Sequence, residues 1–284
     1  MLQGDPLHRR LATSMRFGLA SQFRLAGYAY MCLIVFAWHP DHALPLIVAA
    51  NRDEFYVRPT LPLGHWQDAP GIVAGRDLQA GGTWMGVSTS KRFAALTNIR
   101  APGAAAGSRS RGELPERYLR GQLTPEAYLN ELAGHLEHYA GFNLLVGDEH
   151  ELWYLNSNAA VAEQLRPGLY GLSNAALDSP WPKLLRARAA LQSHIEAPET
   201  VDLMQMLNDP ELAADADLPS TGVPYEWEKR LSSIFITSAD YGTRASTVLI
   251  RRADGSLDIT ERSFGATGAL GDSNISLPPA DSIE

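Results

Sequence analysis

The apolar positions of the chain first form a regular pattern at residue 32, where they predict paired strands. Residues 32–38 (Cys-Leu-Ile-Val-Phe-Ala-Trp) are apolar throughout, as a strand covered on both faces requires. Residues 39–42 (His-Pro-Asp-His) have the composition of a turn, and residues 46–50 (Leu-Ile-Val-Ala-Ala) form a second apolar run. The two runs therefore predict a β-hairpin.

Helical and strand patterns alternate along the rest of the chain. The clearest helix start is Thr124-Pro-Glu, where an N-cap residue precedes a proline and an acid in the first turn. Helices are predicted over residues 124–139, 181–195 and 201–207. Further strands are predicted at residues 84–87, 93–97, 142–146, 152–155, 234–237, 246–250 and 257–263.

The order of these elements indicates the fold class. Strands flank helices without strict βα alternation, which favours an α+β fold of antiparallel sheets with helices packed on their faces. We expect one domain over residues 31–265. The segment after it is rich in Gly, Ser, Pro and Asp, so residues 266–284 are expected to form a flexible tail.

Composition narrows the class of protein. The 284 residues are 45% hydrophobic and 20% charged, which suits a globular chain with a substantial core. The net charge is −8 and no basic block stands out, so nucleic acid is not an expected partner. Because no apolar run reaches about 18 residues, no membrane span is expected and the protein is predicted to be soluble.

The single cysteine and the unusual first 30 residues bear on location. One cysteine excludes an internal disulfide framework and a cysteine-rich zinc site, and it favours a reducing compartment, the cytoplasm. Residues 1–30 are rich in arginine and carry Asp5 as their only acid. They resemble a mitochondrial-type leader, or translation begins at Met31, which the strand pattern starting immediately afterwards favours. Either way, residues 1–30 are expected to lie outside the fold.

Cys32 is the candidate nucleophile. A lone cysteine in a strand is ordinarily a small buried hydrophobe. Met31, however, precedes it, and removal of an initiator methionine would leave Cys32 with a free α-amine. An α-amine with a pKa of about 7.7–8.0 beside a thiol with a pKa of about 8.5 is a base beside a nucleophile.

A series of short motifs gives the chain a family resemblance. The tetrapeptide Asn51-Arg-Asp-Glu54 is the signature of the NRDE family, also called the transport-and-Golgi-organisation family. The other matching motifs are Met31-Cys32, Arg58-Pro59, Ala74-Gly-Arg-Asp77, Gly81-Gly-Thr-Trp84, Leu96-Thr-Asn98 and Tyr241-Gly-Thr-Arg244. The resemblance covers about residues 31–265, in family order, and it also favours Met31 as the start.

The resemblance implies an N-terminal-nucleophile (Ntn) hydrolase type of fold, a four-layer αββα sandwich. It also implies a distant similarity to the cysteine amidohydrolases that cleave conjugated bile salts and penicillin V. Carried over by position, the site residues are Cys32, Arg52, Asp53, Asn98, Asn174 and Arg244. One position departs from those hydrolases, whose aspartate follows the arginine by three residues. Asp53 follows Arg52 directly, so it reaches the same site only if the strand bends or bulges.

The resemblance also implies a role for each of these residues. Arg52 or Arg244 would stabilise the thiolate, and Asp53 would orient the α-ammonium. The amide of Asn98 or of Asn174 would donate to the oxyanion of a tetrahedral intermediate.

Each of these positions also has a purely structural interpretation. Arg52, Asp53 and Glu54 could form a salt-bridged corner. Asn98 and Asn174 could be turn residues just beyond a strand. Arg244 could be a surface cation beside a turn.

Two functional hypotheses follow. The first is a hydrolase that uses an N-terminal cysteine to cleave a linear amide, with no cofactor. The second is a carrier or trafficking protein for a lipid, acyl-CoA or haem ligand, as links between the family and such ligands imply. The spacing of His39 and His42 around Pro40 does not indicate a metal site. The expected ligand is a small amide or a lipid-like molecule, and the sequence does not define the oligomeric state.

Overall fold

The computed structural model describes residues 31–279, which form two antiparallel sheets. Sheet 1 contains the predicted first hairpin, in the spatial order β10-β1-β2-β11-β12-β13. Its strands are β1 (Met31–Trp38), β2 (Leu46–Phe55), β10 (Gly168–Leu172), β11 (Tyr241–Arg251), β12 (Leu257–Gly265) and β13 (Gly268–Leu277). Cys32 pairs with Arg52 across β1 and β2, so the beginning of β1 lies beside the end of β2.

Sheet 2 follows chain order, from β3 to β9. Its strands are β3 (Thr60–Trp66), β4 (Ala69–Asp77), β5 (Met85–Ser88), β6 (Phe93–Asn98), β7 (Phe142–Gly147), β8 (Leu152–Asn156) and β9 (Val161–Gln164). Adjacent strands form a meander of antiparallel pairs, which suits the short connections between most of them.

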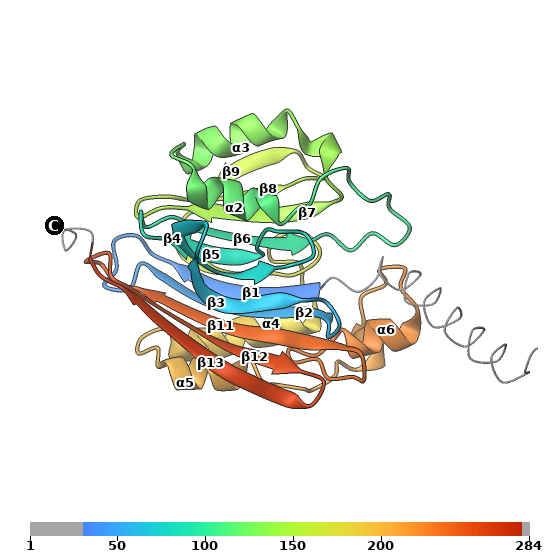
Figure 1. The fold of residues 1–284 in the computed structure, drawn as a ribbon. Coiled ribbons are helices and arrows are strands. Elements are labelled where there is room, and N and C mark those ends of the chain that lie inside the picture. Colours follow the sequence, from blue (N-terminus) through green and yellow to red (C-terminus); the bar gives the residue numbers. More distant parts are fainter. Residues whose placement is uncertain (1–30, 280–284) are drawn as a thin grey trace, which may run out of the picture.

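Helices cover the outer face of each sheet, as Figure 1 shows. The helices are α2 (Glu113–Arg120), α3 (Pro125–Ala133), α4 (Pro182–His194), α5 (Thr200–Met206) and α6 (Tyr225–Arg230), with short 3-10 turns η1 (Leu136–His138) and η2 (Asp215–Asp217). Helices α2 and α3 pack on sheet 2, whereas α4 and α5 pack on sheet 1. The predicted four-layer αββα sandwich is therefore confirmed.

Alternation along β1 assigns its residues to two apolar clusters. Ile34 and Phe36 lie between the sheets, where they pack with residues of sheet 2 such as Val87. Leu33 and Val35 face the other way and pack with α4 and α5. Both faces of β1 are thus buried, which explains why residues 32–38 are apolar at every position.

Polar contacts tie the two sheets together at opposite ends of β1. Near its beginning, Thr97 of β6 donates to the carbonyl of Ser173 at 2.5 Å, and the amide of Asn143 donates to the carbonyl of Ala175 at 2.7 Å. Near its end, the buried guanidinium of Arg251 on β11 donates at 2.8 Å to the carbonyl of Lys91, in the turn between β5 and β6 of sheet 2. Side-chain hydrogen bonds thus hold both ends of the sandwich.

The structure differs from two of the predicted elements. Residues 268–277 form β13, which pairs with β12 along its length, so the tail expected from residue 266 is wrong for this segment. Residues 234–237 do not form a regular strand, although Thr237 makes an isolated bridge to Gly242. Ile234 and Ile236 are apolar because they pack against the helix-side clusters.

The predicted leader at residues 1–30 lies outside the described residues. Within residues 31–279, no helix combines the length and apolar character needed to cross a bilayer.

Candidate active site

A cavity of 660 Å³ opens between the sheets at the beginning of β1. Its wall includes five of the residues predicted for the site, Cys32, Arg52, Asp53, Asn98 and Arg244. Asn174 lies on the wall of a neighbouring depression instead. The fold therefore brings residues from β1, β2, β6 and β11 together, although they are up to 212 positions apart in the chain.

The backbone of Cys32 is fixed on both sides. Its N–H donates to the Oδ1 atom of Asn174 at 3.3 Å, and its carbonyl accepts from the hydroxyl of Ser173 at 2.8 Å. The Nδ2 atom of Asn174 donates to the carbonyl of Asn98 at 2.7 Å. Asn174 therefore links the start of β1 to the end of β6, so its amide is engaged in holding the site together.

Asn98 is placed differently from Asn174. It is the last residue of β6 and lies on the cavity wall. Its side-chain amide makes no hydrogen bond with any residue in the range 31–279. Of the two asparagines, Asn98 has the amide that is available to a ligand.

The thiol of Cys32 is buried, with 7% of the residue exposed. Burial, together with the negative charge of Asp53, raises the pKa of this thiol to about 12, while Arg52 acts in the opposite direction. The thiol is therefore protonated at neutral pH in the chain that retains residue 31. A base must remove its proton before it can act as a nucleophile.

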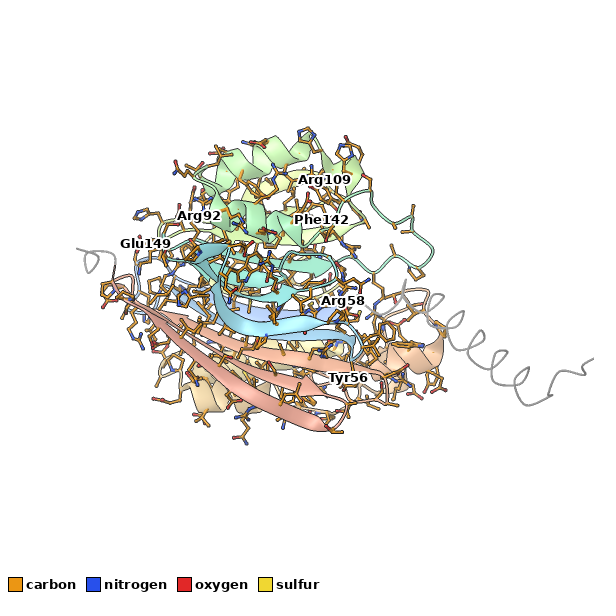
Figure 2. All side chains as sticks on the ribbon, viewed as in Figure 1. Tyr56, Arg58, Arg92, Arg109, Phe142 and Glu149 are labelled. Atoms are coloured by element: carbon orange, nitrogen blue, oxygen red, sulfur yellow. The ribbon has the colours of Figure 1, made fainter. Side chains whose placement is uncertain are left out.

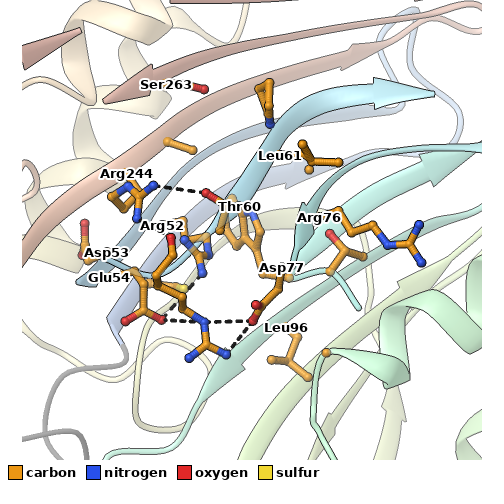
Figure 3. Close-up of a pocket in the computed structure, with 18 of the residues that line it drawn as sticks. Arg52, Asp53, Glu54, Thr60, Leu61, Arg76, Asp77, Leu96, Arg244 and Ser263 are labelled. Carbon is orange, nitrogen blue, oxygen red and sulfur yellow. Dashed lines mark hydrogen bonds and ion pairs between the residues drawn. The ribbon is translucent and has the colours of Figure 1, made fainter. Parts of the chain in front are cut away.

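Arg52 belongs to a chain of charges along the cavity (Figure 3). It lies 3.6 Å from the carboxylate of Glu54, which in turn lies 3.5 Å from Arg58. Arg58 also pairs with Asp77 at 2.6 Å, and its side chain projects between the two sheets (Figure 2). The network fixes Arg52 beside the thiol, where its positive charge favours the thiolate.

Arg244 reaches the same cavity, but its guanidinium donates to two backbone carbonyls and to the hydroxyl of Thr60. Its Nη1 atom donates to the carbonyls of Phe55 at 2.8 Å and Arg58 at 3.0 Å, and Nη2 donates to Thr60 at 3.1 Å. The residue sits at a bulge in β11, where the pairing with β2 shifts between Thr243 and Ala245. Arg244 thus holds the connection between β2 and β3, and Arg52 is the cation that acts on the thiol.

Asp53 lies on the opposite face of β2 from Arg52, because the bulge is in β11 and β2 continues regularly. Its Oδ1 atom accepts from Thr243 at 2.7 Å, whereas its Oδ2 atom is buried without a hydrogen-bond partner among residues 31–279. Burial raises the pKa of Asp53 to about 6, although the positive charge of Lys183 lowers it. Asp53 therefore belongs to a second group of side chains behind the thiol.

This group, the buried polar cluster, consists of Asp53, Lys183 and Tyr241. All three residues are at most 2% exposed. The Nζ atom of Lys183 and the hydroxyl of Tyr241 also have no hydrogen-bond partner among the described residues. Burial lowers the pKa of Lys183 to about 8, with Asp53 acting against that shift. The cluster therefore contains three polar atoms whose hydrogen-bonding capacity is unused.

Met31 lies beside this cluster. It pairs with Asp53 across β1 and β2, and its side chain packs against Trp227, Leu231, Ile236 and Tyr241. The residue whose removal would free the α-amine of Cys32 therefore occupies the helix side of the strand, next to the buried polar cluster.

Lys183 is the site residue that we did not predict from the sequence. A signal existed, because Lys183, Ala187 and Leu191 recur at helical spacing, and all three are buried in α4. A lysine in the core-facing row of a helix is unusual. Metal-binding potential is separate from this site: among the described residues, exposed His135 and Glu137 group with His138, their ligand atoms within 4.8 Å of one another.

The segment that forms this sandwich also matches a protein-family model. The model described as Transport and Golgi organisation 2 matches residues 31–266. The chain is 36% identical over 259 residues to the Transport and Golgi organization protein 2 homolog of Bos taurus, covering 82% of this chain and 93% of that protein. It is 27% identical over 272 residues to Transport and Golgi organization protein 2 of Drosophila melanogaster, covering 86% and 96%. The chain belongs to the Transport and Golgi organisation 2 family.

The solved structures to which this chain is similar include an amidase and a hydrolase. One is a Caenorhabditis elegans ortholog of N-acylethanolamine-hydrolyzing acid amidase, with a TM-score of 0.43, 13% identity, and coverage of 76% of this chain and 92% of that chain. Another is a mutant of the conjugated bile acid hydrolase from Clostridium perfringens, with a TM-score of 0.47, 7% identity, and coverage of 89% and 95%.

Proposed function

We propose that this protein is a hydrolase that cleaves a linear, non-peptide amide of a small molecule with Cys32 as its N-terminal nucleophile. The observation that carries the proposal is the arrangement around the first two residues of β1. The thiol of Cys32 lies on the cavity wall with Arg52, while Asp53 lies opposite residue 31 on the other face. Nucleophile, cation and carboxylate thus surround the position that the α-amine takes once Met31 is removed.

The reaction needs only groups of this chain, the substrate and water. The α-amine accepts the thiol proton, and the thiolate beside Arg52 attacks the substrate carbonyl. The amide of Asn98 donates to the oxyanion, and the leaving amine departs with the proton from the α-ammonium. Water then adds to the thioester, releasing the acid and restoring the thiol. Cys32, Arg52, Asp53 and Asn98 have catalytic roles in this scheme, whereas Asn174 and Arg244 hold their neighbours in place.

A second candidate function is a non-catalytic carrier for a lipid, acyl-CoA or haem ligand. The observation that favours it is the burial of Cys32, which raises the pKa of its thiol to about 12 in the chain that retains residue 31. A protonated thiol would leave the 660 Å³ cavity able to bind a ligand but unable to attack it. The two functions therefore differ in whether the α-amine of Cys32 is free.

Intact mass and a reactivity assay test the proposal together. The full-length gene and a gene that starts at Met31 are expressed in parallel, and intact mass identifies protein whose first residue is Cys32. That species is incubated with a thiol-directed acyl probe and with a panel of N-acyl amides, beside a Cys32→Ala variant. We expect Cys32 to be acylated and an amide to be cleaved only when Cys32 is first. Binding of a panel member with equal affinity by both proteins, without cleavage, would favour the carrier.

A further inference from the structure

Not every charged side chain around the start of β1 has an ion-pair partner of opposite charge. On the cavity side, Arg52 faces Glu54 at 3.6 Å. On the helix side, Arg100 pairs with Glu228 at 2.6 Å, and both side chains are at most 7% exposed. Once these pairs are set aside, one carboxylate and one ammonium remain in the buried polar cluster. They belong to Asp53 and Lys183.

Asp53 is the carboxylate that acts on the charge of buried Lys183, although the two side chains form no ion pair with each other. It lies in the first turn of α4 and is 1% exposed, and its Nζ atom has no hydrogen-bond partner among residues 31–279. The groups that act on its charge are Asp53 of β2, Cys32 of β1 and Arg100 after β6. Because an isolated buried ammonium is very costly, Lys183 depends on the negative charge of Asp53.

Removal of Met31 places a second amine in the same cluster. The α-amine of Cys32 is the nitrogen that donates to Asn174 Oδ1 at 3.3 Å, and the residue whose removal frees it pairs with Asp53 across the two strands. The cluster then holds two amines and one carboxylate. One buried carboxylate stabilises one cation in a site of low polarity, so the two amines compete for the positive charge.

We propose that Lys183 is a positioning residue that takes the charge-compensating place beside Asp53 and so keeps the α-amine of Cys32 neutral. This inference rests on the proposed function, because it concerns the chain whose first residue is Cys32. A neutral α-amine can accept the thiol proton, whereas an α-ammonium held by Asp53 cannot. Lys183 therefore makes the base available without contacting the substrate.

The titration of the two side chains agrees with this division of charge. In the chain that retains residue 31, the pKa of Lys183 is about 8 and that of Asp53 is about 6, so around pH 7 the lysine is mainly protonated and the aspartate mainly ionised. Without Lys183, the α-ammonium is the cation left within the cluster to compensate Asp53, with Arg52 acting from the other face of β2. The pKa of the α-amine is then expected to rise. Without Asp53, the positive charge of Lys183 acts alone, and the pKa of the α-amine is expected to fall.

The single cysteine of the chain makes a direct measurement practical. Protein with Cys32 as its first residue is labelled with [15N,13C]cysteine, and the 15N shift of its α-amine is followed from pH 5 to pH 10. The variants are Lys183→Met, Lys183→Arg and Asp53→Asn, with Lys229→Met as the matched control. Lys229 is a suitable control because it lies on α6, where it pairs with Asp215 at 2.5 Å. Each protein is also tested with the thiol-directed acyl probe.

We expect a midpoint below the ordinary range of about 7.7–8.0 in the parent protein. Lys183→Met should raise it by about one pH unit, so that the neutral fraction near pH 7 falls by roughly fourfold to eightfold. Lys183→Arg should keep it low, Asp53→Asn should lower it, and Lys229→Met should leave it unchanged. Loss of packing alone would not raise the midpoint in Lys183→Met and lower it in Asp53→Asn.

Two results separate this inference from the proposed function. An unchanged midpoint in Lys183→Met, with the acyl probe still labelling Cys32, would overturn the role of Lys183 and leave the hydrolase intact. The expected midpoint shifts with no acylation of Cys32 would support the role of Lys183 and remove the hydrolase. If Lys183→Met does not fold, a midpoint that rises or stays constant in Asp53→Asn would equally overturn the inference.

Discussion

Asn51 and Asp53 lie two positions apart on the same face of β2, yet their surroundings differ. The Nδ2 atom of Asn51 donates to the carbonyls of Leu207 at 2.9 Å and Ile234 at 2.8 Å, and its Oδ1 atom accepts from Ser246 at 2.6 Å. Asp53 has one partner for Oδ1 and none among the described residues for Oδ2. The amide of Asn51 has all its hydrogen bonds to the fold, whereas the buried carboxylate of Asp53 has hydrogen-bonding capacity left over.

The strongest test of this division is removal of the nucleophile. Cys32→Ala deletes the thiol at a position that is 7% exposed and leaves the backbone bonds to Asn174 and Ser173 available. We expect complete loss of amide cleavage, with ligand binding and the urea unfolding midpoint nearly unchanged. A Cys32→Ala protein that cleaves an identified substrate at the parental rate would contradict the mechanism.

Asn98→Ala sharpens the contrast between available and engaged amides. Loss of one preorganised donor should lower kcat by about 10²–10³-fold with little change in KM or in the unfolding midpoint. Asn174→Ala is the comparison, because its amide bonds to the backbones of Cys32 and Asn98. That variant should lose stability as well as rate. Equal losses of stability in both variants would mean that Asn98 is structural too.

Asn51→Ala tests whether the fully hydrogen-bonded amide of Asn51 stabilises the fold. The change leaves the buried carbonyls of Leu207 and Ile234 without their donor, so the free energy of unfolding in urea should fall by about 2–4 kcal/mol. Exposed Asn158→Ala serves as the control and should change it by less than about 0.5 kcal/mol. A stable Asn51→Ala protein that has lost only activity would place Asn51 in the chemistry.

Asp53→Asn tests the unsaturated side through pH. Burial raises the pKa of Asp53 from 3.8 to about 6, so its contribution to stability is full below pH 3.8 and is lost as pH rises through about 6. The asparagine lacks this loss. Its unfolding free energy relative to the parent should therefore rise by about 1–3 kcal/mol between pH 4 and pH 7, as measured in urea. A constant difference across that range would mean that Asp53 titrates normally.

Local patterns predicted most of the fold. The first hairpin and helices α4 and α5 follow from runs whose period matches their environment. β13 was missed because its glycines and polar residues carry no strand pattern, and only its pairing with β12 makes it a strand. The strand predicted at residues 234–237 was wrong for the opposite reason. Their apolar side chains serve burial without a neighbouring strand to complete a ladder.

Sequence motifs identified most residues of the candidate site. They did not show which of these residues contact one another in the folded chain. The sequence placed Cys32 and Arg52 in one hairpin, and the β1–β2 register sets them opposite each other. It offered Arg52 and Arg244 as equal cations, and only the structure shows the latter bonded to backbone carbonyls. Lys183 is about 150 positions from Cys32, and no local pattern relates α4 to the beginning of β1.

The polar contacts at the two ends of the sandwich also bear on how the cavity can change shape. Thr97 and Asn143 fasten one end, and Arg251 fastens the other. Sliding of one sheet over the other would break buried hydrogen bonds at both ends at once, which makes that motion stiff. Breathing of the cavity is therefore left to the connections on its rim, such as residues 106–112 and the hairpin between β12 and β13. Movement of these rim segments would accommodate ligands of different width, while the distances from Cys32 to Arg52 and Asn98 stay constant.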